Sequence, residues 1–157
     1  MTDVDDLRRL SAGYAAAVDA LDGDAFADLF TTDGELWVPD AALGAEPTIR
    51  RAGAEQLRRI PSGLARYHST SHRVGATSYE LRSDMAVGTV IGEAHHLTAS
   101  AEAAAGDRDG GPGVDTIWYL RYEDEYRRVT EGWRIAKRAL HLLSIEERSV
   151  DQLGPGR

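Results

Sequence analysis

The sequence contains no cysteine, and this absence removes several kinds of chemistry. A chain without thiols forms no disulfide, offers no cysteine nucleophile and builds no thiolate metal site. No apolar run approaches the roughly 18 residues that a membrane-spanning helix needs. The N-terminal stretch MTDVDDLRRL is charged at once and contains no apolar signal segment. Together these absences predict a soluble, cytoplasmic protein with no membrane partner.

Positive charge is also scarce. The 157 residues include 18 Lys and Arg against 26 Asp and Glu, which gives a formal net charge of −8. A surface of this sign repels phosphate backbones, so we expect no nucleic-acid partner. The length suits one domain with a substantial core, over residues 1–150, followed by a disordered tail at 151–157.

The first part of the chain has the periodicity of helices. Apolar residues recur three and four apart from Val4 to Leu21, which is the stripe of an amphipathic helix. Asp22-Gly23 ends this helix. The predicted elements that follow are a short helix over 24–30, a strand over 35–38, a loop over 40–50 and a helix over 52–60.

The second part alternates in the manner of β-strands. We expect strands over 70–79, 85–96, 115–129 and 133–144, with turns at 83–84 and 130–132 and a glycine-rich loop over 101–113. Helices that precede a run of antiparallel strands indicate an α+β fold. The specific prediction is a cone-shaped barrel, in which a strongly bent, mostly antiparallel sheet packs against about three N-terminal helices.

Two histidines occupy positions in these strands where aliphatic residues are typical. His72 shares one side of its strand with Val74 and Ala76, and His96 shares a face with Val90. A single buried histidine is most often an ordinary core residue. Two histidines that point into the same concavity predict a functional site.

The spacing of the histidines argues against a metal site. His68 and His72 lie on one side of the strand, four residues or about 13 Å apart, while a metal–histidine bond is about 2 Å long. His95 points away from His96, because neighbouring strand residues face opposite sides. We therefore expect neither a metal nor an organic cofactor.

Three segments together resemble a known family. They are YAAAVDALDGDAFADLFTTDGELW, STSHRVGATSYE and DEYRRVTEGWRIAKR, and they are similar to the SnoaL-like branch of the nuclear transport factor two-like superfamily, over roughly residues 5–147. The resemblance implies the fold. It leaves the reaction open, because the superfamily includes isomerases, dehydratases, cyclases, hydrolases and non-catalytic subunits.

Three members of the superfamily imply roles for particular residues. The resemblance to scytalone dehydratase implies that His72, His96 and Asp22 lie in the pocket. The resemblance to hexachlorocyclohexane dehydrochlorinase also pairs His72 with Asp22, and it adds Arg138. The resemblance to ketosteroid isomerase implies that Tyr14 polarises a substrate oxygen. The catalytic set implied is therefore His72, Asp22, His96 and Tyr14.

Residues of the strands supply the predicted substrate-binding set. Trp37, Trp118 and Tyr122 are expected as pocket wall or core. Asp124 either faces the pocket as a buried carboxylate or is solvated, if a bulge shifts the register. Arg138 pairs with Asp124, with Asp22 or with a leaving group.

These residues predict a cofactor-independent enzyme of the dehydratase type, which acts on an apolar cyclic or polyketide-like metabolite. His72 would remove a proton from carbon, and His96, Tyr14 or Arg138 would stabilise the charge or protonate the departing oxygen. A cyclase or isomerase stays open, as does a non-catalytic binding or assembly subunit. We also expect a homo-oligomer, either dimer or trimer, because the outer face of a wide sheet leaves apolar area uncovered.

Overall fold

The computed structural model describes residues 2–40, 46–100 and 111–154. The helices are α1 (Asp3–Asp19), α2 (Gly23–Ala27), α3 (Gly53–Arg58) and the 3₁₀ helix η1 (Pro61–Arg66). The strands are β1 (Phe30–Pro39), β2 (Pro47–Ala52), β3 (Ser69–Arg82), β4 (Met85–Ala99), β5 (Gly113–Val129) and β6 (Gly132–Val150). These elements confirm the predicted α+β fold.

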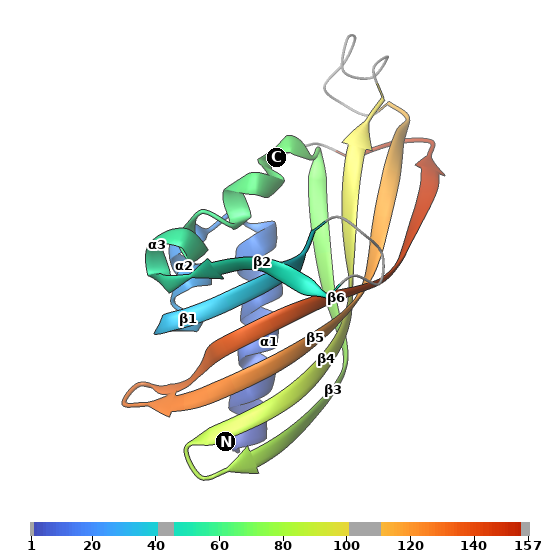
Figure 1. The fold of residues 1–157 in the computed structure, drawn as a ribbon. Helices are drawn as coiled ribbons and strands as arrows, with labels where there is room; N and C mark the ends of the chain where they lie inside the picture. Colours follow the sequence, from blue (N-terminus) through green and yellow to red (C-terminus); the bar gives the residue numbers. More distant parts are fainter. Residues whose placement is uncertain (1, 41–45, 101–110, 155–157) are drawn as a thin grey trace.

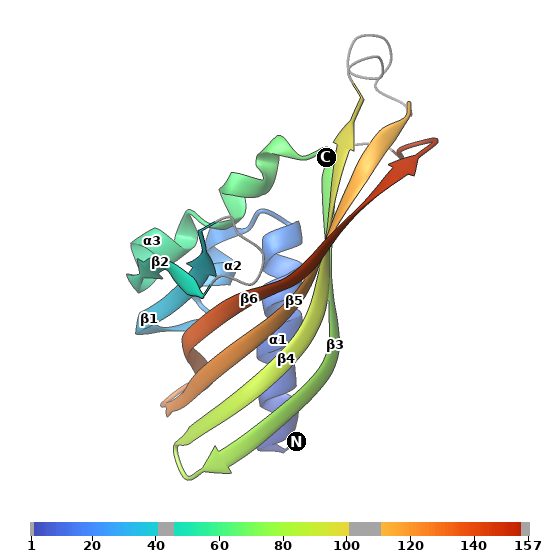
Figure 2. The ribbon, with the colours of Figure 1, turned by 45° about the vertical axis from the view of Figure 1, so that its right-hand side comes forward.

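The six strands form one bent and strongly twisted sheet in the order β2-β1-β6-β5-β4-β3 (Figure 1). β1 runs parallel to β6, and the other neighbours are antiparallel. Helix α1 lies along one face of the sheet, which we call the inner face, and the short helices flank it on the same side (Figure 2). The opposite face is the outer face.

Helix α1 begins with a capping box, in which Thr2 and Asp5 satisfy each other's backbone N–H groups. Its apolar stripe is buried against the sheet, including Leu7 and Val18. None of the helices in the described ranges is long and apolar enough to cross a membrane.

The chain reverses sharply between α1 and α2. Helix α1 ends at Asp19, two residues before the predicted end, and Leu21 then adopts a positive φ of 56°. Gly23 follows at a close approach, because a Cβ atom there would lie 2.1 Å from the carbonyl oxygen of Arg58. This glycine lets α2 pack directly against the C-terminal end of α3.

Two predicted boundaries around β1 were wrong. Phe30 begins β1 instead of ending a helix, and the predicted loop over 40–50 contains the start of β2. β2 is an edge strand that pairs antiparallel with β1. An edge strand with little burial needs few apolar residues, and Ile49 alone gives the sequence no visible alternation.

Strand β3 contains a register shift between Val74 and Thr77. His72 faces α1, while Tyr79 packs its ring against Tyr126 in the core. Simple alternation had predicted that His72 and Tyr79 face opposite sides, and the bulge corrects this. Both residues therefore lie on the inner face although they are an odd number of positions apart.

The described part of the C-terminal tail is anchored, although the sequence predicts disorder from residue 151. Leu153 is buried, and its N–H donates to the carbonyl oxygen of Gly111 at 3.0 Å. The Nε2 atom of His68 lies 2.9 Å from the carbonyl oxygen of Gly154. Residues 155–157, and residues 101–110 of the predicted loop, lie outside the described ranges.

Candidate active site

A histidine–aspartate pair joins β3 to the last turn of α1. The Nδ1 atom of His72 lies 2.7 Å from Oδ1 of Asp19, and the backbone N–H of His72 donates to Oδ2 at 2.7 Å. The hydroxyl of Thr70 donates to Oδ1 at 2.8 Å. Three hydrogen bonds therefore fix the carboxylate relative to the imidazole.

The electrostatics of this pair fix the position of one proton. Burial alone would raise the pKa of Asp19, but the hydrogen bonds from His72 and Thr70 hold that pKa below its usual value. An ionised Asp19 can only accept, so Nδ1 of His72 carries a hydrogen and Nε2 of the neutral ring carries the lone pair. His72 is thus held in the tautomer that a general base requires.

The partner of His72 is Asp19, and the predicted pairing with Asp22 was wrong. Oδ1 of Asp22 accepts a hydrogen bond from the backbone N–H of Ala25 at 2.9 Å and caps α2 in an exposed position. One signal for Asp19 was present in the sequence. An acidic residue in the last turn of a helix opposes the helix dipole, so its presence there calls for a compensating partner.

His96 is buried on β4 next to His72, with ring centroids 5.9 Å apart. The rings of Tyr67 and Trp118 flank it at 4.8 Å and 4.9 Å. Nδ1 of His96 donates to the carbonyl oxygen of Thr116 at 3.2 Å. The structure therefore brings together His96 and Trp118, as expected, and adds Tyr67, which the sequence reasoning did not single out.

The protonation state of His96 changes its expected role. Burial lowers the pKa of His96 to about 4. The ring is therefore neutral at pH 7, with its proton on Nδ1 and a lone pair on Nε2. In this state Nε2 of His96 can accept a hydrogen bond but not donate one, so the predicted role of proton donor does not fit it.

We expect this buried neutral histidine to make the stability of the fold depend on pH. Between the ordinary pKa of 6.5 and the folded value of about 4, the unfolded state binds the proton and the folded state does not. The contribution of His96 to the free energy of unfolding is therefore fully present above pH 6.5. It falls by about 3 kcal/mol as the pH drops to about 4.

Urea unfolding of the wild type and of His96→Gln at neutral pH and near pH 4 checks this expectation. Carboxylates contribute alike to both proteins, so the difference between the two pH profiles isolates His96. Parallel profiles would show that His96 is not held neutral by the fold.

Arg138 and Asp124 form a buried ion pair on the inner side of β5 and β6. Nε and Nη2 of Arg138 donate to the two carboxylate oxygens at 2.8 Å and 2.7 Å, and the Tyr126 hydroxyl donates to Oδ2 at 2.5 Å. The guanidinium lies between the rings of Tyr14 and Tyr122, at 4.4 Å and 4.5 Å. Of the two alternatives predicted for Asp124, a buried or a solvated carboxylate, the structure shows the buried one. It pairs with Arg138.

A cavity of about 10 Å³ separates this ion pair from His72. Ser11, Tyr14, Tyr122 and Arg138 border it together with His72, and its volume corresponds to about one water molecule. Burial raises the pKa of Tyr14, so its hydroxyl stays protonated and can donate a hydrogen bond. Tyr14 and Arg138 therefore lie beside His72, as expected from the sequence.

Trp37 does not line this site. Leu36 is buried on the inner face, so the alternation of β1 turns Trp37 to the outer face. There its Nε1–H donates to Glu35 at 2.7 Å, and the Lys137 ammonium lies 5.7 Å from its ring centroid. The predicted substrate-binding role of Trp37 on the inner side was wrong for this reason.

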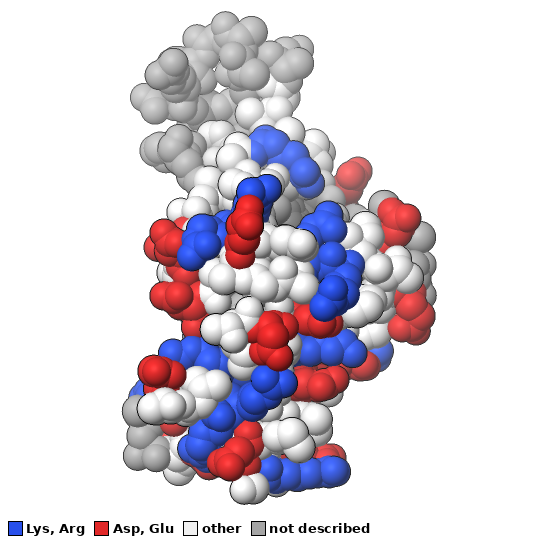
Figure 3. All heavy atoms as spheres, turned by 60° about the vertical axis from the view of Figure 1, so that its left-hand side comes forward, with Lys and Arg blue, Asp and Glu red and all other residues white. Residues whose placement is uncertain are grey.

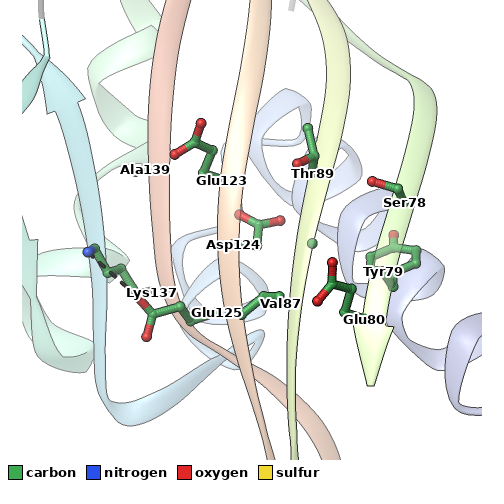
Figure 4. A pocket seen from close by; sticks show the side chains of 11 residues that line it. Ser78, Tyr79, Glu80, Val87, Thr89, Glu123, Asp124, Glu125, Lys137 and Ala139 are labelled. Atoms are coloured by element: carbon green, nitrogen blue, oxygen red, sulfur yellow. Dashed lines mark ion pairs between the residues drawn. The ribbon is translucent and has the colours of Figure 1, made fainter. Parts of the chain in front are cut away.

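A second hollow, of about 390 Å³, opens on the outer face and contains no residue of the histidine–aspartate pair (Figure 4). Its border includes Glu80 on β3, Thr89 on β4, Glu123 on β5 and Lys137 on β6. Across the ranges that the structure describes, no group of three or more histidine, aspartate and glutamate side chains is arranged to hold a metal ion.

Comparison with known families settles the relationship of the chain. The model of the SnoaL-like domain matches residues 1–139. The chain belongs to the SnoaL-like family. A search of curated proteins found no match to this SnoaL-like protein.

Solved structures agree with this assignment. A protein of unknown function from Mycobacterium tuberculosis is 26% identical, with a TM-score of 0.67 over 87% of this chain and 69% of that one. A protein provisionally named as a scytalone dehydratase, from Novosphingobium aromaticivorans, is 20% identical, with a TM-score of 0.69 over 95% and 89%. A hexachlorocyclohexane dehydrochlorinase of type 3 from Novosphingobium barchaimii is 17% identical, with a TM-score of 0.68 over 94% of each chain.

These likenesses concern the fold. The relatives include lyase-type enzymes and proteins of unknown function on the same scaffold. The reaction of this chain therefore depends on the residues of its own site.

Proposed function

We propose that this SnoaL-like protein is a cofactor-independent lyase, which removes water from a small cyclic or polyketide-like metabolite. The observation that supports this most is the Asp19–His72 pair, because it presents an imidazole lone pair on the inner face of the sheet. The aromatic rings of Tyr67 and Trp118 lie close by, around His96, and suit a flat apolar ligand.

The proposed reaction begins with proton transfer from carbon to Nε2 of His72. The carbon lies next to a carbonyl group, and the electron pair of the broken C–H bond forms the new C=C bond as the neighbouring C–O bond breaks. Ionised Asp19 stabilises the imidazolium that results. The departing hydroxyl then needs one proton to leave as water.

His72 itself is the best proton donor for that second step. His96 is neutral, and its Nδ1–H already donates to Thr116. The imidazolium formed at His72 therefore returns its proton to the leaving hydroxyl on the same side of the substrate. His96 accepts a hydrogen bond from a substrate hydroxyl through Nε2, and this bond orients the ring of the substrate.

An isomerase or cyclase is the second candidate, and the position of Tyr14 favours it. Tyr14 borders the same small cavity as His72 and is protonated, so it could polarise a carbonyl oxygen. Tyr14→Phe separates the two reactions. An isomerase that depends on this donor loses most of its turnover, whereas a dehydratase that uses His72 for both proton transfers keeps its turnover.

The partner aspartate provides a test with a matched control three residues away. A panel of cyclic β-hydroxy ketones is incubated with the protein in D₂O, and NMR follows water loss and α-proton exchange. On a substrate that the wild type converts, we expect Asp19→Asn to lower kcat about 10- to 100-fold, because it weakens the orientation and basicity of His72.

Asp22→Asn keeps a side chain that caps α2 well, so its kcat should equal that of the wild type. Equal losses in both variants would contradict the assignment of Asp19. Wild-type turnover in both would contradict a role of Asp19 in the reaction, and a wild type that converts no member of the panel would leave the non-catalytic binding or assembly subunit as the better description.

A further inference from the structure

One segment of this acidic chain is basic, and it contains His72. Residues 56–79 include four arginines and no aspartate or glutamate, whereas the whole chain carries −8. The segment covers the end of α3, all of η1 and the first part of β3. η1 and the start of β3 lie at the same end of the sheet (Figure 1). Figure 3 turns the side with α3 and η1 toward the viewer, and basic side chains are as prominent there as acidic ones.

Arg66, the last residue of η1, differs from the other arginines of this segment. It is exposed, and no carboxylate in the described part of the chain pairs with it. Its guanidinium carbon lies 4.8 Å from the ring centroid of Tyr67, and its Nη2 donates to the Tyr67 hydroxyl at 3.1 Å. A guanidinium has five N–H donors, so further donors are available to a ligand. The other three arginines are paired, namely Arg58 with Asp24, Arg59 with Glu55 and Arg73 with Glu93.

Tyr67 connects this unpaired cation to the candidate active site. The ring of Tyr67 lies 4.8 Å from that of His96, which in turn lies 4.9 Å from that of Trp118. Burial is the largest cause that lowers the pKa of His96, and the charges of His72 and Arg66 lower it further. Arg66 therefore adds positive potential at the place where the aromatic rings would hold a ligand.

We propose that Arg66 binds a carboxylate of the substrate, so that the site selects cyclic metabolites that carry an acid group. A planar guanidinium can donate to both oxygens of a carboxylate, and such charge-assisted hydrogen bonds are stronger than neutral ones. The contact with Tyr67 holds the guanidinium beside the ring of the ligand. Arg66 determines specificity and takes no part in the proton transfers of His72. The inference rests on the proposed function and adds the chemical class of the substrate.

Calorimetric titration with two probes of the same shape tests the proposal without any turnover. The probes are 2-naphthoate, which carries a carboxylate, and its neutral counterpart 2-naphthamide. We expect the wild type to bind the acid about five- to tenfold more tightly than the amide. Arg66→Gln should bind the two probes equally, at the wild-type affinity for the amide. Arg66→Lys keeps the charge without the planar fork, so it should retain part of the preference.

Arg134→Gln is the matched control for the loss of one positive charge. Among the described residues Arg134 also lacks a carboxylate partner, and it donates to the carbonyl oxygen of Trp133. It pairs with Arg127, at the end of β5 farthest from Trp118. This control should therefore keep the wild-type preference for the acid.

Three outcomes would overturn the proposal. They are a wild type that binds the amide as tightly as the acid, binding of neither probe at millimolar concentration, and equal losses in Arg66→Gln and Arg134→Gln. If the preference is present but the D₂O assay finds no water loss, the proposed reaction alone is contradicted.

Discussion

His72→Ala should lower kcat by about 10²- to 10⁴-fold on any substrate that the wild type converts. In the proposed reaction this imidazole takes the proton from carbon and returns it to the leaving hydroxyl, so its loss affects both proton transfers. The methyl group of alanine replaces a ring that is mostly buried against Asp19, and the backbone N–H still donates to the carboxylate. The fold should therefore be retained.

Two measurements separate catalysis from structure in this variant. Circular dichroism and the thermal midpoint report whether the fold is intact, and KM reports whether substrate still binds. A matched control is His141→Ala, since His141 lies on the outer face beside Glu123. Wild-type kcat in His72→Ala, or an equal loss in His141→Ala, would contradict the role of His72.

Among single substitutions in the described chain, we expect Arg138→Met to destabilise the fold most. The Arg138 and Asp124 side chains are 1% and 0% exposed, so removing the guanidinium leaves a buried carboxylate without its counter-charge. The expected loss is about 3–5 kcal/mol of unfolding free energy. Burial alone would lower the pKa of Arg138, but the Asp124 carboxylate raises it above the usual value, so the guanidinium is charged at every relevant pH.

The double variant Arg138→Met/Asp124→Leu removes both charges and should recover much of the loss, because no unpaired ion remains. Arg58→Met breaks an exposed pair with Asp24 and should cost less than about 1 kcal/mol. Urea unfolding measures all three proteins. If Arg138→Met and Arg58→Met lost similar amounts, the buried pair would not have the stabilising role that its burial implies.

The long strands were predictable because they are buried on one side. The buried residues of β4 are all even-numbered, burial in β5 alternates from Leu120 to Tyr126, and the pairing of the two strands has no irregularity from Met85 to Ala99. The edge strand β2 was not predictable, because few of its side chains are buried and burial is what creates alternation. Helix α1 was visible from its stripe, but its last turn was placed two residues too late.

Most residues of the candidate site were predictable from the sequence. His72, His96, Tyr14, Tyr122, Asp124 and Arg138 all lie on the inner side, as expected. The choice between Asp19 and Asp22 depended on where the helix ends, which a positive φ at Leu21 decides. The tautomer and charge of His96 depend on the Thr116 carbonyl and on burial, neither of which a sequence displays.

The bulge of β3 divides that strand into two halves with opposite phase. Upstream, even-numbered residues such as His72 face α1, and downstream the odd-numbered Tyr79 faces the core. Losing one residue between Val74 and Thr77 would place His72 and Tyr79 an even number of positions apart, so a regular strand paired with β4 would keep both side chains on the inner face. The extra residue therefore bends the strand without exchanging the side chains that face the core, and the pairing with β4 sets the inward side on both sides of the bulge.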